Sequence, residues 1–163
     1  MLPRKLRSPD VRLPLFLLLS FLVVIDAEGQ TSGNRYINPA GLVKPTGYTH
    51  VVLAADRRTV YIAGQVAFDS TGKVVGEGDF KAQAEQVYGN LRKALASVGA
   101  TFADLVKTTT LVTDGKNVPA LREIRTRYLD PQNPPANTLI VATLVRPELL
   151  LEIEAVAVLP TAR

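Results

Sequence analysis

The last third of the chain contains two runs that are rich in β-branched and aliphatic residues. These runs are residues 138–144 and 151–159, and Pro147 lies in the short segment between them. A breaker between two such runs predicts an antiparallel hairpin. In the second run, Glu152 and Glu154 are two positions apart, so a strand places both on one face. Two carboxylates at the start of an otherwise apolar strand need water, a partner or a chemical function.

Three earlier runs of apolar and β-branched residues also predict strands. They are residues 48–53, 59–66 and 105–113. The short polar segment 55–58 joins the first two, which predicts another antiparallel hairpin. Gly64 interrupts the second run, and a glycine there indicates a bulge, tight packing, or the close approach of a ligand to the backbone.

Two segments instead repeat apolar residues at three- and four-residue spacing, which is typical of amphipathic helices. The first is expected to begin after Asp79, a good N-cap, and to end before Gly99. The second is expected to begin near Asn117, with Pro119 in its first turn. The apolar stripe of the first helix is Phe80, Ala84, Val87, Tyr88, Leu91, Ala94, Leu95 and Val98. That of the second helix is Leu121, Ile124 and Tyr128.

The predicted order is therefore β-β-α-β-α-β-β, and the simplest packing is an α+β fold with both helices on one face of a mixed sheet. Several predicted strands, such as residues 51–53 and 139–141, are apolar on both faces. A strand that is buried on both sides needs a cover on each side. Because both helices are used on the first face, another copy of the chain is expected on the second, which predicts an oligomer.

The amino-terminal segment has the pattern of a secretory signal peptide. Residues 1–12 are basic, residues 13–25 are apolar, and the small residue Ala27 follows. The apolar run is shorter than the ~20 residues of a typical membrane-spanning helix. We expect residues 1–27 to direct export to the periplasm or the medium, and no stable membrane anchor after cleavage. The alternatives are a retained anchor, or a misassigned start codon and a cytoplasmic protein.

The remainder of the chain is predicted to comprise a polar linker at residues 28–36 and one domain at residues 37–163. Its composition excludes several classes of function. The chain of 163 residues has a net charge of +4, and four of its 19 basic and two of its 15 acidic residues lie in the first 27, which leaves +2. That balance predicts no nucleic-acid partner. The absence of cysteine excludes disulfides, thiolate catalysis and cysteine-bound zinc. His50 is the single histidine, which argues against a protein-built transition-metal site.

Several segments, in this order and spacing, resemble the Rid (YjgF-like) family of reactive-intermediate imine deaminases. They are TGYTHVV, VYIAGQV, TFADLVKTTTLVTD, PPANT and EIEAVAV, and the resemblance extends over residues 37–160. It implies a chorismate-mutase-like α+β fold and a homotrimer with its sheets facing inward. It also implies ligand clefts between neighbouring subunits. The implied reaction hydrolyses small imines and enamines, such as 2-iminopropanoate, to a 2-keto acid and ammonia, with no cofactor.

The resemblance also assigns candidate residues. Glu152 matches the family's water-orienting glutamate, Tyr48 a tyrosine that reaches into the cleft, and Gly64 a glycine whose backbone lines it. Such a site needs donors for the substrate carboxylate, a positioned water, and a group that moves protons. The alternative for Glu152 is a strand-edge carboxylate paired with an arginine. The alternative for Tyr48 is an interface hydroxyl.

One position departs from the pattern of the active deaminases. Asn137 stands where they carry an arginine that grips the substrate carboxylate, and a neutral amide replaces a charged fork. Arg122 and Arg146 are candidates for a substitute cation. The sequence thus predicts a hydrolase of altered substrate range. The alternative is a non-catalytic trimer that binds a small metabolite, and an endoribonuclease or chaperone-like activity is less favoured.

Overall fold

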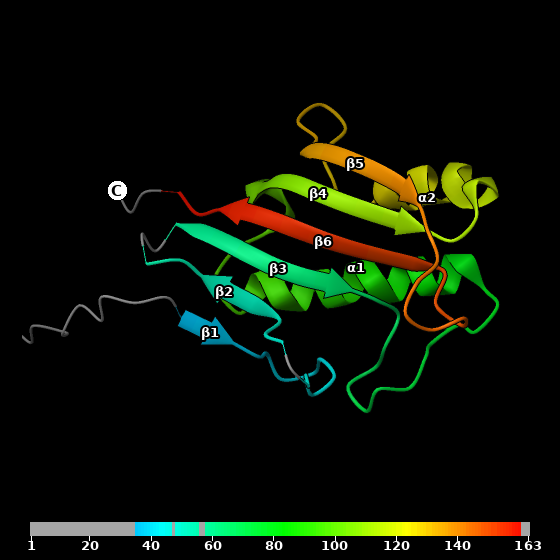
Figure 1. Ribbon diagram of the computed structural model, residues 1–163. Coiled ribbons are helices and arrows are strands. Elements are labelled where there is room, and N and C mark those ends of the chain that lie inside the picture. Colours follow the sequence, from blue (N-terminus) through cyan, green and yellow to red (C-terminus); the bar gives the residue numbers. More distant parts are fainter. Residues whose placement is uncertain (1–34, 47, 56–57, 161–163) are drawn as a thin grey trace, which may run out of the picture. The chain divides into compact units, whose positions relative to one another are not determined.

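The computed structural model describes residues 35–46, 48–55 and 58–160, which form one six-stranded sheet with two helices packed on one face (Figure 1). The predicted signal peptide and the first part of the predicted linker lie outside the described residues. In chain order the elements are β1 (Arg35–Ile37), β2 (Val51–Leu53), β3 (Thr59–Gln65), α1 (Phe80–Ala96), β4 (Leu105–Val112), α2 (Val118–Arg125), β5 (Ala136–Val141) and β6 (Leu151–Val158).

The strands lie in the order β1-β2-β3-β6-β4-β5, and every pair is antiparallel except β4 with β5. The expected α+β class is confirmed, and so is the placement of both helices on one face of a mixed sheet. Strand β1 adds one element to the predicted order. It begins at Arg35, inside the segment that the sequence assigns to a linker. Only three residues long, β1 lacks the alternation that would have revealed it.

The predicted hairpin of the last two strands is wrong. Strand β4 lies between β5 and β6, and it pairs with β5 in parallel and with β6 in antiparallel orientation. Two parallel strands need a crossover, and α2 supplies it between β4 and β5. The run LVKTTTLV in β4 is rich in β-branched residues, which favour strands, and β4 pairs along both of its edges inside the sheet.

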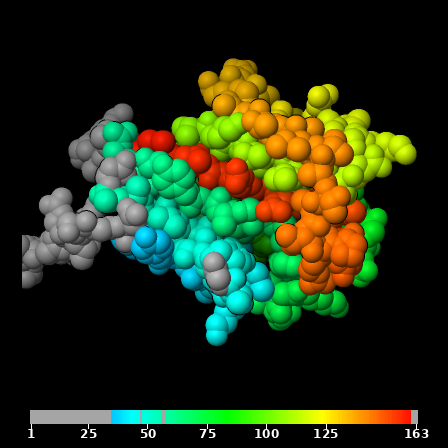
Figure 2. Space-filling model, viewed as in Figure 1, coloured from blue at the N-terminus to red at the C-terminus, as the bar shows by residue number. Residues whose placement is uncertain are grey.

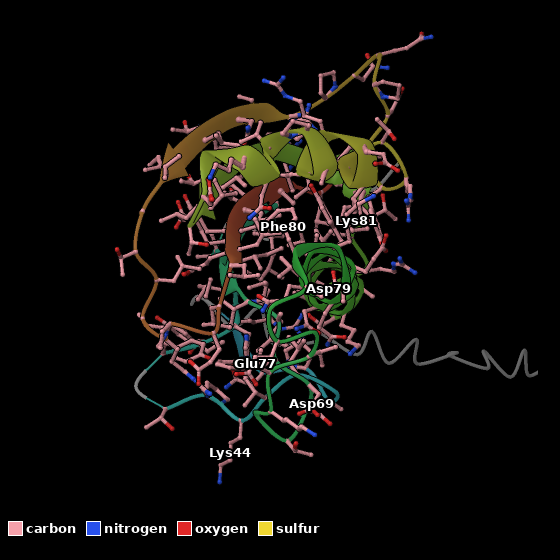
Figure 3. The ribbon with its side chains drawn as sticks, turned by 90° about the vertical axis from the view of Figure 1, so that its right-hand side faces the viewer. Lys44, Asp69, Glu77, Asp79, Phe80 and Lys81 are labelled. Carbon is pink, nitrogen blue, oxygen red and sulfur yellow. The ribbon has the colours of Figure 1, made fainter. Side chains whose placement is uncertain are left out.

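The first helix follows its predicted pattern. Asp79 caps it by accepting hydrogen bonds from the backbone N–H groups of Lys81 and Ala82, at 3.0 and 3.1 Å. Figure 3 views this end of α1, with Asp79, Phe80 and Lys81 at its first turn. Gly99 follows the helix with a φ of +75°, which favours glycine. The second helix differs, because Asn117 occupies its N-cap position without a side-chain cap bond.

The two faces of β6 have opposite characters. Leu151, Ile153, Ala155 and Ala157 are buried against the helices, while the residues between them point to the other face. Nothing in the described part of the chain covers that open face, which Figure 2 shows along β3 and β6. It includes Tyr61, which is 53% exposed. Within the described residues, no helix is both long and apolar enough to cross a membrane.

Gln83 is a buried polar link between α1 and the segment that leads into β6. Its amide donates to the carbonyls of Gly76 and Glu148, at 3.2 and 2.7 Å, and accepts from the Leu150 N–H at 2.9 Å. Gln83→Ala would leave these backbone groups unpaired. We therefore expect a loss of about 1–3 kcal/mol in the free energy of unfolding, measured by urea denaturation.

Lys81→Ala on the same helix is the matched control. It removes only an exposed ion pair with Glu123, at 3.5 Å, and is expected to cost about 0–1 kcal/mol. Equal losses for the two variants would contradict the structural importance assigned to Gln83.

Candidate functional site

Glu152 and Gly64 meet on the open face of the sheet. A Cβ atom placed on Gly64 would lie 1.8 Å from Oε1 of Glu152, so the carboxylate packs directly against the backbone of β3. The register of β3 against β6 shifts between Ile62 and Gln65, which is the irregularity that the sequence indicates at Gly64. Glycine at this position therefore makes room for the carboxylate.

The surroundings of Glu152 favour its protonated form. Burial, followed by the negative charge of Glu154, raises the pKa of the Glu152 carboxyl above its usual range. No described residue forms a hydrogen bond or ion pair with its carboxylate, so the arginine partner considered from the sequence is not found in this part of the chain. A half-buried carboxylate without a protein partner is able to accept a hydrogen bond from water or from a ligand.

Tyr48 lies in the same region, in a shallow hollow that it lines together with His50, Gly64, Gln65 and Phe68. Its ring packs edge-on against the His50 ring, with 5.1 Å between the centroids, and its side chain stays 47% exposed. Burial raises the pKa of the Tyr48 hydroxyl, which remains a hydrogen-bond donor at neutral pH.

The His50 ring packs against Tyr48, and Gln65 in turn forms a hydrogen bond with His50. The sequence analysis did not identify this function for either residue. Gln65 Nε2 donates to Nδ1 of His50 at 3.3 Å, and His50 Nε2 donates to the carbonyl of Val43 at 2.9 Å. These contacts require the neutral tautomer with its proton on Nε2. Both side chains are buried, with 3% and 2% exposed. The sequence did contain a signal for them, because His50 just before β2 and Gln65 at the end of β3 are polar residues at inward-facing positions.

Asn137 lies elsewhere. Its Oδ1 accepts hydrogen bonds from the hydroxyls of Thr108 and Thr110, at 2.9 and 3.0 Å, so it is on the helix side of the sheet. There it lines a cavity of about 160 Å³. The other residues lining this cavity are Tyr88, Thr110, Leu121, Arg122, Arg125 and Leu139. Gly64 therefore contacts the carboxylate of Glu152 and also lines the hollow of Tyr48, whereas Asn137 lies on the opposite face of the sheet from Glu152.

The two candidate cations differ in position. Arg122 lines the Asn137 cavity, whereas Arg146 forms an ion pair with Glu148 at 3.0 Å and lies over the ring of Phe68. Arg125 also lines the cavity and was not singled out from the sequence. The sequence could have indicated it, because Arg125 is three residues from Arg122 and residues three apart share a helix face.

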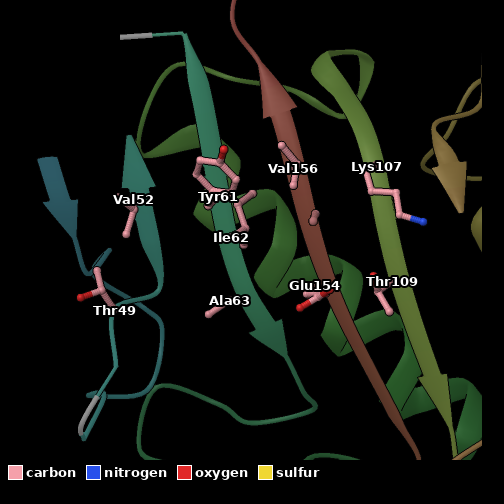
Figure 4. Close-up of a pocket in the computed structure, with 10 residues that line it drawn as sticks. Thr49, Val52, Tyr61, Ile62, Ala63, Lys107, Thr109, Glu154 and Val156 are labelled. Atoms are coloured by element: carbon pink, nitrogen blue, oxygen red, sulfur yellow. The ribbon is translucent and has the colours of Figure 1, made fainter. Parts of the chain in front are cut away.

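A larger hollow of about 340 Å³ lies on the open face (Figure 4). Glu154 and Thr109 are register partners on its floor, and Lys107 and Tyr61 line its sides. Sequence analysis did not single out Lys107. Among the described residues, no group of three or more His, Cys, Asp or Glu side chains could hold a metal ion.

Comparisons with known proteins identify the family of the chain. The family model described as Endoribonuclease L-PSP matches residues 42–159, well over half of the chain. A RutC family protein from Synechocystis sp. is 34% identical over 128 residues, which cover 78% of this chain and 98% of that protein.

Two solved structures from Yersinia pestis are also similar, and both are described as proteins of unknown function of the conserved Rid protein family. YyfA is 25% identical with a TM-score of 0.72, covering 78% of this chain and 100% of that one. YyfB is 40% identical with a TM-score of 0.57, covering 78% and 99%. The chain therefore belongs to the Rid (YjgF-like) family, whose domain is described as Endoribonuclease L-PSP.

Proposed function

We propose that the protein is a cofactor-independent hydrolase of small imines or enamines, in which Glu152 positions the attacking water. The observation that carries this proposal is the Glu152 carboxylate, half-buried against Gly64 and without a described protein partner. A buried, unpaired carboxylate is costly for stability, and such groups concentrate at functional sites. Family membership makes imine hydrolysis the first reaction to test.

The chemistry requires one base that can also act as an acid. Glu152 accepts a proton from water while the water oxygen forms a bond to the imine carbon, and the C=N electron pair moves to nitrogen. The carboxyl then returns the proton to nitrogen, and the carbinolamine collapses to a carbonyl compound and ammonia. A raised pKa suits both steps, because it brings the carboxyl closer to neutral pH.

The site needs a second subunit to be complete. In a single chain, Glu152 and Asn137 lie on opposite faces of the sheet, so one substrate cannot contact both. We propose a homotrimer with the open faces of its sheets directed inward. Exposed apolar side chains support this arrangement, since Tyr61 and Ile140 are 53% and 43% exposed on the open face. A neighbouring copy would bring its own Asn137 cavity towards Glu152.

Asn137 sets a limit on the substrate. An uncharged amide forms hydrogen bonds worth about 1 kcal/mol, against about 1.5–3 kcal/mol for a charged donor. Activity on 2-imino acids is therefore proposed to depend on a cation elsewhere.

The competing function is a trimer that binds a metabolite without turnover, and melting shifts without ammonia release would favour it. Cleavage of RNA is disfavoured by the near-neutral charge of the chain outside the predicted signal peptide. Export of the protein stays a prediction.

Replacing Gly64 tests the packing beneath Glu152. In Gly64→Ala the added methyl would occupy the position of Oε1, so the carboxylate must move away. Because a displacement of about 1 Å can cost about 100-fold, we expect ammonia release from 2-iminopropanoate and related imines to fall by about 10- to 100-fold.

Gly89→Ala is the matched control for this substitution. Gly89 lies within α1, and no atom lies within 4 Å of its hypothetical Cβ. The control should keep full activity and gain up to about 1 kcal/mol of stability. Unchanged activity in Gly64→Ala would remove the support for Glu152 as the water-positioning group.

Glu152→Gln separates activity from stability. The variant should lose ammonia release, whereas the wild-type rate should fall as pH drops through the raised pKa of Glu152, because the base becomes protonated. Stability moves the other way. A raised folded-state pKa means that wild type loses stability as pH rises from the unfolded to the folded pKa, while glutamine does not titrate.

From about pH 4 to about pH 8, the melting temperature of Glu152→Gln relative to that of wild type should therefore increase as the pH rises. Full turnover by Glu152→Gln, at any pH, would rule out the proposed mechanism.

The trimer is tested by a charge on the open face. Ile140 pairs with Leu111 in the register and lies on the same face as Glu152, so Ile140→Asp should place a charge in the subunit interface. We expect a trimer for wild type and dissociated chains for the variant, by light scattering after gel filtration. Ala96→Asp, on the exposed side of α1, should remain trimeric. A monomeric wild type would contradict the shared cleft.

A further inference from the structure

The side-chain amide of Gln65 has one orientation, and its two neighbours decide which. Gln65 Nε2 lies 2.9 Å from the carbonyl oxygen of Ala63, which can only accept a hydrogen bond. The nitrogen of the amide, and not its oxygen, must therefore face Ala63. The same nitrogen lies 3.3 Å from Nδ1 of His50, so that ring atom is also an acceptor. The amide oxygen, Oε1, consequently points away from both partners.

Oε1 of Gln65 has no hydrogen-bond donor among the described residues, although only 2% of Gln65 is exposed. Every fully buried side-chain nitrogen or oxygen of the described residues has a partner, so Oε1 is not sealed inside the core. Gln65 lines the shallow hollow beside Tyr48, here called the Tyr48 hollow, and the free acceptor faces this space. A buried acceptor without a donor costs about 1–3 kcal/mol, so a donor in the hollow would stabilise it.

Tyr48 provides a second free polar group at the hollow. Its hydroxyl has no described hydrogen-bond partner, and its side chain is half exposed. Asn90 also lines the hollow, but its amide donates to two backbone carbonyls, at 3.0 and 2.8 Å, and accepts from Gln86 at 3.1 Å. Both ring nitrogens of His50 are likewise in use. The side-chain groups left for an occupant are therefore the Gln65 oxygen and the Tyr48 hydroxyl.

The volume of the Tyr48 hollow, about 20 Å³, limits the occupant to one very small molecule. A bound water needs at least about 10–15 Å³ of such space, together with about two to four polar partners. Pockets for metabolites are usually larger than about 300 Å³. Leu42, Val43 and Val66 add apolar surface, which offers no further side-chain partners. Size and polarity therefore fit one water molecule and exclude a ligand with a carbon skeleton.

We propose that the Tyr48 hollow binds one water molecule, which donates a hydrogen bond to Gln65 Oε1 and forms another with the Tyr48 hydroxyl. The water extends the buried hydrogen-bond chain of Gln65 and His50 to a tyrosine at the surface. Gln65 is thereby a positioning residue that holds the Tyr48 hydroxyl beside Gly64. The water site requires no reaction, but its effect on turnover rests on the proposed function, in which Glu152 packs against the same glycine.

A high-resolution crystal structure of the full chain tests the site directly. Wild type should show one water within about 2.5–3.0 Å of both Gln65 Oε1 and the Tyr48 hydroxyl. Gln65→Met keeps the length of the side chain but removes the acceptor, so this variant should lose the water and the fixed position of Tyr48. Gln86→Met is the matched control, because Gln86 donates to the Phe68 carbonyl at 2.9 Å but does not line the hollow. The control should keep the water.

Tyr48→Phe is a second variant, needed because Gln65→Met also removes the donor to His50 and risks misfolding. It leaves the contacts between Gln65 and His50 intact and removes only the outer partner of the water, whose electron density should be lost or weakened. Ammonia release by Gln65→Met should fall by about tenfold, because a displacement of about 1 Å can cost about 100-fold. Release by Gln86→Met should equal that of wild type.

The outcomes separate this inference from the proposed function. A dry hollow in wild type, or unchanged water density in Gln65→Met or Tyr48→Phe, overturns the site even if Glu152→Gln loses turnover. A water that depends on Gln65, in a protein that hydrolyses no imine, supports the site and contradicts the hydrolase. A melting temperature that rises with ammonium chloride but not with sodium chloride, and only while Gln65 is present, overturns the assignment to water.

Discussion

The contact between Glu152 and the bare backbone at Gly64 is the constraint on which the candidate site depends. A carboxylate on the open face of a sheet would ordinarily extend into water. Here Gly64 has no side chain, so the Glu152 carboxylate packs directly against the backbone of β3. That position half-buries the group and raises its pKa. The position of Glu152 thus depends on a residue that contributes no functional group of its own.

The second feature is that the sheet separates the candidate groups. Strand β6 carries Glu152 on the open face, while the edge strand β5 directs Asn137 towards the helices. A small ligand cannot pass through a sheet, so under the proposed function a single chain holds two incomplete halves of a site. The apolar side chains on the open face provide the physical reason for copies to associate. Assembly and chemistry are therefore linked in the proposal.

The third feature is the location of positive charge. Family resemblance directs attention to the strand position of Asn137, where the charge is missing. The crossover helix α2 packs beside the same strand, and it presents Arg122 and Arg125 to the same cavity. A cavity between a strand and a helix can receive a guanidinium from either wall. Its electrostatic character can therefore be retained when the residue on one wall changes.

The sequence by itself determined the type of every helix and strand except β1, the burial pattern of β6, and the position of Glu152 and Glu154 on one face, because these follow from local periodicity and capping chemistry. Resemblance identified the family and directed attention to Gly64. Only the tertiary structure decided that β4 separates β5 from β6, and that Asn137 faces away from Glu152. Both depend on contacts between segments far apart in the chain. Periodicity assigns a side chain to a face, but strand order decides which faces and helices meet.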